Sequence, residues 1–380
     1  MNGKISKRDF IKIMMAGTGY LAMGGVPLPL FSSTPGSGGL KKPWKWSKEA
    51  IYYIKTPKGL KCKLCPQHCD IKEGELGDCR TRQNFNGTLY SIVYGNPCAI
   101  HLDPIEKKPL NHFLPQSLAY SLATAGCNLA CLNCQNYTIS QASPYDTRNY
   151  DLMPEQVVEE ALKYQAKSIA YTYSEPIVFY EYVLDTAKLA HMEGIKNVFV
   201  SAGYINEQPL RNLCPYLDAA NIDLKSFSND IYEMLNAGTL EPVLNTLKVM
   251  KEEGVWLEIT NLVVPQWNDD MDMIKKMCDW LYDNGFNDTP LHFSRFHPDY
   301  KLANLPPTPV ETLNRAREIA MQAGLNYVYI GNVPGSEAQN TYCPNCHKLL
   351  VERDGFLVKQ NHIKNGKCEF CQTEIAGVWQ

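Results

Sequence analysis

Residues 125–136 read Ala125-Gly126-Cys127-Asn128-Leu129-Ala130-Cys131-Leu132-Asn133-Cys134-Gln135-Asn136, which places three cysteines in the spacing C-x3-C-x2-C. Three thiolates on one loop can hold three corners of a cubane iron–sulfur cluster. No fourth cysteine follows nearby, so the fourth iron would have no protein ligand. Such an iron can bind a substrate or cosubstrate, just as catalytic zinc sites keep one coordination position open.

Bulk composition narrows the classes of protein to consider. A formal charge of −3 and an isoelectric point near 6.3 give no electrostatic reason to expect nucleic acid or an anionic membrane as partner. Of the 14 cysteines in the 380 residues, most lie in three tight clusters. Clusters of the C-x2-C kind are typical of metal sites rather than of a disulfide framework. The remaining cysteines are expected to be buried small hydrophobic residues: Cys98, Cys214 and Cys278.

The second cluster precedes the first along the chain and comprises Cys62, Cys65, Cys69 and Cys79. Four thiols at this spacing can bind zinc tetrahedrally or hold an auxiliary iron–sulfur cluster. Disulfides are the alternative if the chain is exported. The third cluster, Cys343, Cys346, Cys368 and Cys371, has paired C-x2-C knuckles and resembles a zinc ribbon. We expect structural Zn²⁺ there, since no basic stripe with aromatic residues supports nucleic-acid binding.

Between about residues 118 and 332, short β-branched runs alternate with amphipathic segments. This alternation predicts an α/β fold with a parallel sheet. Strands are expected at Ala119–Ala125, Ser168–Tyr173, Asn197–Ser201, Ala220–Leu224, Trp256–Val264, Pro290–Arg295 and Tyr327–Ile330. Helices are expected at Pro154–Gln165, Ile177–Glu193, Val243–Glu253, Asp270–Asp283 and Val310–Ala323. The three-cysteine loop then follows the first strand, at the sheet edge where barrels of this type carry their chemistry.

Two segments before the sheet are interpreted separately. Thr88–Gly95 reads as a strand. The charged segment His101–Phe113 reads, from its composition alone, as solvated surface.

The spacing C-x3-C-x2-C resembles the signature of the radical S-adenosylmethionine (SAM) superfamily. Together, several segments resemble one branch, the radical SAM enzyme of the AmmeMemoRadiSam system, which is related to the activases of glycyl-radical enzymes such as pyruvate formate-lyase. The similarity extends over nearly everything after about residue 50. The matching segments are Cys62–Cys79, Asp103–Leu110, Cys127–Asn136, Tyr171–Pro176, Arg295–Lys301, Gly331–Gly335 and the last four cysteines.

This resemblance implies a partial (β/α)6 radical SAM barrel at 116–335. A small N-terminal cysteine-rich metal-binding domain at 50–115 precedes the barrel, and a C-terminal zinc-ribbon-like domain follows at 336–380. Cys127, Cys131 and Cys134 would bind a [4Fe–4S] cluster. Asn133 stands where the family usually places an aromatic residue next to the adenine.

The resemblance also implies a SAM pocket at the strand ends. In the superfamily a Gly-Gly-Glu-Pro turn follows the second strand, and here only Glu175 and Pro176 match it. Ser201 is expected near the ribose. Asp223 and Lys225 share one face of a strand, so Lys225 can pair with the SAM carboxylate, although a plain salt bridge is the alternative. His297 is expected at the barrel mouth.

The implied function is reductive cleavage of SAM to a 5′-deoxyadenosyl radical that abstracts hydrogen from an unidentified substrate. The expected partners are a low-potential electron donor of the flavodoxin or ferredoxin type and, for an activase, a protein substrate. A non-catalytic metal-handling or electron-transfer metalloprotein is the alternative from another class.

Residues 1–38 resemble a twin-arginine export leader and linker, with Lys7 in place of the first arginine. A leader of this kind indicates export or membrane tethering, whereas the supply of SAM and of electrons favours the cytoplasm.

Overall fold

The computed structural model describes residues 43–380, which belong to one compact unit. The leader and linker expected at 1–38 lie outside the described residues. No helix between residues 43 and 380 combines the length and the apolar composition needed to cross a membrane.

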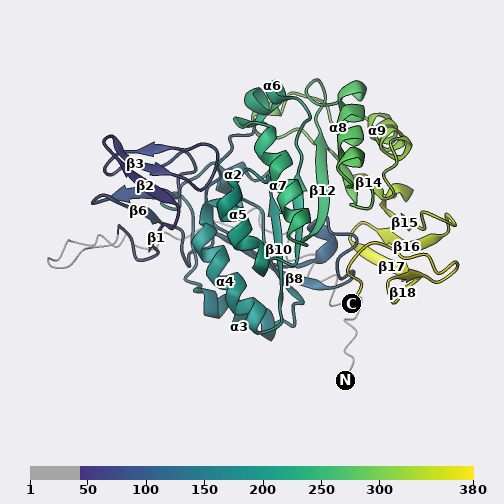
Figure 1. The fold of residues 1–380 in the computed structure, drawn as a ribbon, viewed down its shortest axis with the longest axis horizontal. Helices are drawn as coiled ribbons and strands as arrows, with labels where there is room; N and C mark the ends of the chain where they lie inside the picture. Colours follow the sequence, from purple (N-terminus) through teal and green to yellow (C-terminus); the bar gives the residue numbers. More distant parts are fainter. Residues whose placement is uncertain (1–42) are drawn as a thin grey trace, which may run out of the picture. The chain divides into compact units, whose positions relative to one another are not determined.

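An eight-stranded sheet forms the centre of the described chain (Figure 1). Strands β8 to β14 are parallel and lie side by side in chain order, so the sheet is an open, barrel-like array rather than a doubly wound one. Strand β7 pairs antiparallel with β8 at the edge. The strands are β7 (Ala99–Pro104), β8 (Leu118–Ala123), β9 (Ser168–Tyr171), β10 (Lys196–Ser201), β11 (Ala219–Asp223), β12 (Trp256–Val263), β13 (Leu291–Arg295) and β14 (Val328–Gly331). All seven strands expected in this region are confirmed, to within two residues at either end.

Helices connect successive parallel strands. Those expected from apolar periodicity are confirmed, and α8 begins where the Asp270 side chain accepts a hydrogen bond from Met273 N at 2.7 Å. Helix α5 was missed because it is short and contains Pro209. The helices are α2 (Tyr137–Ser140), α3 (Pro154–Lys163), η2 (Pro176–Phe179), α4 (Tyr180–Met192), α5 (Glu207–Leu213), η3 (Cys214–Tyr216), α6 (Asn229–Ile231), η4 (Tyr232–Asn236), α7 (Glu241–Glu252), α8 (Met271–Asp283), η5 (Tyr300–Leu302) and α9 (Val310–Gln322).

Two small antiparallel sheets precede the main sheet. One consists of β1 (Lys48–Glu49), β6 (Thr88–Ser91) and β5 (Arg82–Phe85), and the other of β2 (Tyr53–Thr56), β3 (Gly59–Cys62) and β4 (Asp70–Ile71). The strand expected at Thr88–Gly95 is therefore present but ends at Ser91. A buried ion pair attaches this part to α4, because Arg82 Nη2 lies 2.8 Å from both carboxylate oxygens of Glu181.

The C-terminal part is also antiparallel. It contains η6 (Glu337–Gln339), β15 (Thr341–Tyr342), β16 (Leu349–Asp354), β17 (Leu357–Asn361), β18 (Ile363–Lys364) and β19 (Lys367–Cys368). Its last residues contact the segment between β7 and β8, where Val378 forms an isolated parallel bridge with Phe113 and accepts a hydrogen bond from Leu114 N at 2.7 Å.

The expectation of a solvated charged segment at 101–113 is wrong. Asp103, Glu106 and Lys108 are buried, and η1 (Ile105–Lys107) begins the segment that continues β7. Its apolar residues Ile105 and Phe113 pack with Leu110 against small apolar residues of strands β8 to β11. Composition alone gives the wrong prediction because apolar residues alternate with the charged ones, and their burial places the charged neighbours in the interior as well. Each buried charge then needs a partner.

Glu258, in the middle of β12, supplies one such partner. Its carboxylate accepts hydrogen bonds from Asn111 N at 2.9 Å, His112 N at 2.7 Å and His292 Nε2 at 2.6 Å. Burial opposes the charge, but His292 and these amides lower the pKa of Glu258. The ionised carboxylate therefore anchors the segment 105–114 under the sheet.

We expect Glu258→Gln to lower the free energy of unfolding by about 3 kcal/mol, because an amide cannot accept three hydrogen bonds and turns its own N–H donors toward one of the two backbone N–H groups. Urea unfolding measures this loss. The matched control is Asp279→Asn, which breaks the exposed i,i+4 pair with Lys275 and should cost less than about 0.5 kcal/mol. Equal losses in both variants would contradict the anchoring role.

Candidate functional site

The three-cysteine loop leaves the C-terminal end of β8 and ends at α2. Each sulfur has a nearby polar group: Leu129 N donates to Cys127 Sγ at 3.4 Å and Asn236 Nδ2 donates to Cys131 Sγ at 3.2 Å. The Ser140 hydroxyl lies 3.0 Å from Cys134 Sγ. Hydrogen bonds of this kind stabilise thiolates and tune the potential of iron–sulfur clusters.

A turn of π-helix, η4, packs against the three-cysteine loop and bonds to its backbone. The carbonyls of Asn236 and Leu235 accept hydrogen bonds from Ala130 N at 3.0 Å and Leu132 N at 2.9 Å. The turn ends at Ala237, whose φ of 57° is left-handed. Single π turns occur often at functional sites, and here the wide turn places both its backbone and the Asn236 side chain against the cysteine loop.

The distances between the three sulfurs of this loop distinguish it from a site for a single metal ion. Among residues 43–380, only the four C-terminal cysteines bring three or more ligand atoms within 4.8 Å of one another. Burial raises the pKa of Cys127 and of Cys131, so both thiols need a cation to stay ionised. Three separated, hydrogen-bonded sulfurs on one loop fit three corners of a [4Fe–4S] cluster.

Glu175 lies next to this loop, at the N-terminus of η2. Its buried carboxylate accepts hydrogen bonds from Ser201 Oγ at 2.6 Å, Ala202 N at 2.8 Å and Ile177 N at 3.2 Å. Burial nevertheless raises the pKa of Glu175 to about 7. The structure thus joins Glu175 and Ser201 directly, and the carboxylate orients the backbone after β10.

Asp223 and Lys225 form an ion pair of 2.8 Å at the end of β11, as their shared strand face predicts. Burial opposes the lysine's charge, but Asp223 and Cys131 raise the pKa of Lys225 above its usual value. Lys225 therefore lies between the carboxylate and the cysteine loop, where it would stabilise a Cys131 thiolate.

His297 is the sequence-predicted residue that the structure does not bring into contact. It is exposed in the loop after β13, and its side chain makes no hydrogen bond to any residue between 43 and 380. The same loop still reaches the cysteines through its backbone, because Lys301 N donates to Leu132 O at 3.2 Å. The rings of Tyr137 and Tyr300 also stack, with centroids 4.5 Å apart.

Tyr173 occupies the place of a family glycine and has a φ of 64°, a conformation that glycine adopts without strain. Its hydroxyl donates to the Asp103 carboxylate, and Lys108 Nζ lies 4.5 Å from the ring centroid. Lys108 Nζ also lies 2.6 Å from Asp103 Oδ2, and burial lowers the pKa of Lys108 to about 8. These contacts compensate the strained backbone next to Glu175. Sequence reasoning missed them because it placed Asp103 and Lys108 in solvent.

The N-terminal cysteines Cys62, Cys65, Cys69 and Cys79 line one common cavity. Burial raises the pKa of Cys62 and Cys65, and raises that of Cys69 to about 12. These thiols therefore need a metal centre to become thiolates at neutral pH.

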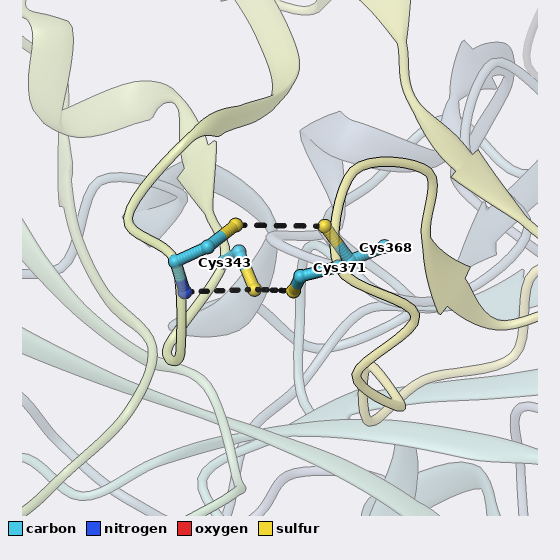
Figure 2. Close-up of side chains that lie close together, drawn as sticks. Cys343, Cys368 and Cys371 are labelled. Carbon is cyan, nitrogen blue, oxygen red and sulfur yellow. Dashed lines mark hydrogen bonds between the residues drawn. The ribbon is translucent and has the colours of Figure 1, made fainter.

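The C-terminal cysteines converge tightly (Figure 2). Cys343 Sγ lies 3.6 Å from Cys371 Sγ, and Cys346 Sγ lies 3.7 Å from Cys368 Sγ. Four sulfurs around one Zn²⁺ at 2.3 Å would lie about 3.8 Å apart, so the spacing fits a tetrahedral zinc site.

The three leftover cysteines lie outside these groups. Cys214 and Cys278 are buried as expected, whereas Cys98 is partly exposed.

Comparison with known proteins agrees with this geometry. The family model described as the Radical SAM superfamily matches residues 121–281, which contain the cysteine loop, Glu175 and Lys225. A protein of Methanocaldococcus jannaschii described as uncharacterized is 48% identical over 331 residues, 86% of this chain and 98% of that protein. The chain contains a radical SAM domain.

More distant relatives include activating enzymes. The pyruvate formate-lyase 1-activating enzyme of Escherichia coli is 24% identical over 219 residues, 52% of this chain and 87% of that enzyme. A solved domain of a pyruvate-formate lyase-activating enzyme from Bacteroides vulgatus has 16% identity and a TM-score of 0.38, over 43% of this chain and 99% of that domain. The sequence matches to pyruvate formate-lyase activating enzymes show homology to the activating enzymes of glycyl-radical enzymes.

Gly126 precedes the first cluster cysteine with a φ of 98°, and an added Cβ would lie 2.3 Å from Thr81 Cγ2 and 2.5 Å from Cys79 O. We expect Gly126→Ala to displace the cysteine loop and to lower the bound iron by at least about half, measured after anaerobic reconstitution. Gly194→Ala is the matched control, because its φ of 72° is equally left-handed but nothing lies within 4 Å. It should cost about 1 kcal/mol of stability and leave iron unchanged. Full iron in Gly126→Ala would contradict the close packing.

Proposed function

We propose that this protein is a radical SAM enzyme that uses a [4Fe–4S] cluster to cleave SAM reductively. The observation that carries the proposal is the convergence of three hydrogen-bonded, separated cysteine sulfurs with Glu175 and the Asp223–Lys225 pair at the C-terminal ends of neighbouring strands. The bound cluster and SAM supply a 5′-deoxyadenosyl radical that abstracts hydrogen from a substrate.

The chain's own residues would bind and orient the cosubstrate. Cys127, Cys131 and Cys134 hold the cluster, and Glu175 places a buried negative charge beside it for the cationic SAM. Lys225 offers a cation for the SAM carboxylate. Ser201, whose hydroxyl donates a hydrogen bond to Glu175, is proposed to contact the ribose. The amide oxygen of Asn133 is buried with no partner among the described residues, so it can accept a hydrogen bond from a ligand.

Within the superfamily, the proposal is the AmmeMemoRadiSam radical SAM enzyme. The buried Asp103–Lys108 pair supports it, because the segment with the branch's motif is built into the structure next to the Glu175 turn. The substrate stays unidentified. Activation of a partner protein as a glycyl-radical-enzyme activase is the second candidate, supported by the relatives that are activating enzymes.

The proposal includes partners, metals and location. A flavodoxin- or ferredoxin-type donor supplies low-potential electrons, and nucleic acid has no role. Zn²⁺ occupies the C-terminal cysteines, whose sulfur spacing supports it. We propose that the reaction takes place in the cytoplasm, where SAM and electrons are supplied, and that the leader-like residues 1–38 tether the protein to the membrane.

The reconstituted, dithionite-reduced protein should release 5′-deoxyadenosine from SAM, measured by chromatography. Cys131→Ala should abolish this release while leaving about one zinc per chain, because the two sites share no ligand. Cys278→Ala is the control, since this buried cysteine lies in α8 away from all three clusters and should leave the release unchanged. An intact cluster without any 5′-deoxyadenosine would refute the radical mechanism and favour a non-catalytic metalloprotein.

SAM affinity should rise with pH across neutrality. Since the pKa of Glu175 is about 7, its ionised fraction increases from about one tenth at pH 6 to about nine tenths at pH 8. The ionised form attracts the SAM cation, so the dissociation constant measured by equilibrium binding should fall by up to about tenfold over this range. Glu175→Gln should bind weakly and lose this dependence. A dependence that persists in Glu175→Gln would assign it to another group.

A further inference from the structure

The four N-terminal cysteines line one common pocket. Apart from the sulfurs, much of its wall is apolar, with Leu64, Ile71 and Val178 among the lining residues. Four thiols in apolar surroundings suit a metal centre that is bound by thiolates.

The sulfur positions differ from those of a zinc site. The C-terminal cysteines bring pairs of sulfurs to 3.6 and 3.7 Å, as a single tetrahedral ion requires. The N-terminal cysteines do not converge within 4.8 Å in any group of three. In a cubane cluster each sulfur binds a different iron at a different corner, so the four sulfurs stand farther apart. The chain thus contains one four-cysteine group with the spacing of a single-ion site and one with wider spacing.

Arg82 adds an independent observation. It lines the cavity, its side chain is 1% exposed, and only its Nη2 is bonded, to Glu181. Its Nε and Nη1 atoms are buried without a partner among the described residues. Two unpaired buried donors are costly unless a ligand accepts from them, and the sulfides of a cluster are such acceptors.

The cavity also lies against the radical SAM loop. The carbonyl of Cys79 lies 2.5 Å from a Cβ built on Gly126, directly before Cys127. Asn128, directly after Cys127, lines the cavity, and Gln67 Nε2 donates to the Asn128 carbonyl at 2.9 Å. The two cysteine groups are therefore separated by little more than one layer of backbone.

We propose that Cys62, Cys65, Cys69 and Cys79 hold a second [4Fe–4S] cluster rather than zinc, placed to exchange electrons with the cluster on Cys127, Cys131 and Cys134. A low-potential protein donor would transfer one electron to this second cluster and so lower its oxidation state by one. The electron then passes to the neighbouring cluster, and the second cluster returns to its oxidised form. This relay depends on the proposed radical SAM function, whereas the identity of the metal does not.

Metal analysis with Mössbauer spectroscopy on the anaerobically reconstituted full chain tests the assignment. The expected content is about eight iron ions and one zinc ion per chain, all iron in cubane clusters. About four iron ions with two zinc ions, or with disulfides at the N-terminal cysteines, would overturn it.

The triple variant Cys127→Ala, Cys131→Ala, Cys134→Ala isolates the second site. We expect about four iron ions to remain, with an electron paramagnetic resonance spectrum of the reduced protein that SAM does not alter. Loss of all iron from a variant that is folded by circular dichroism would overturn the proposal. If the wild type fails to cleave SAM but this variant keeps its iron, the proposed function fails and the second cluster stands.

Arg82→Gln with Glu181→Gln removes the cavity's cation and its counter-charge together, which avoids a stranded buried carboxylate. In the triple-variant background this pair should shift the reduction potential of the remaining cluster to more negative values while iron content holds. An unchanged potential would overturn the contact between Arg82 and the cluster.

Discussion

Three thiolates on one short loop repel one another and must still point at separate corners of one iron–sulfur cluster. The neighbouring segments must therefore hold that loop in a fixed shape. Other segments hold the loop: the π turn through Asn236 and Leu235, the segment after β13 through Lys301, and the N-terminal cysteine loop through Gly126 and Cys79. Because these contacts are mostly to backbone, the loop keeps its shape independently of its own side chains.

Charged side chains in the interior are also held by partners from other segments. Three buried carboxylates each have a nitrogen partner: Glu181 has Arg82, Asp103 has Lys108 and Glu258 has His292. The first two pairs join a segment outside the main sheet to the sheet or to its helices, and the third links the neighbouring strands β12 and β13. Tyr173 shows the effect most clearly, since its bond to Asp103 stabilises a left-handed backbone that a glycine would otherwise supply beside Glu175.

Much of the fold was predictable because strands buried on both faces read as apolar runs, and their connecting helices show a clear apolar stripe. The cysteine groups and the Asp223–Lys225 pair were likewise readable from spacing along the chain. Asn236 and Arg82 were not, because they reach their sites from segments tens of residues away and carry no local motif. His297 was placed by resemblance, but no described contact joins it to the cluster loop.

The sequence by itself determined which atoms are available for chemistry, since the type and spacing of ligands are local properties. It showed the loop with three cysteines, the two groups of four cysteines, and the acidic and basic residues that follow successive strands. Only the tertiary structure decided how far apart the sulfurs stand and which charges are buried. Sulfur–sulfur distance depends on how separate loops pack against each other, and burial depends on which apolar neighbours carry a charge inward. For that reason two C-x2-C groups that look alike in sequence differ in space, one converging on a single ion and the other surrounding a cavity.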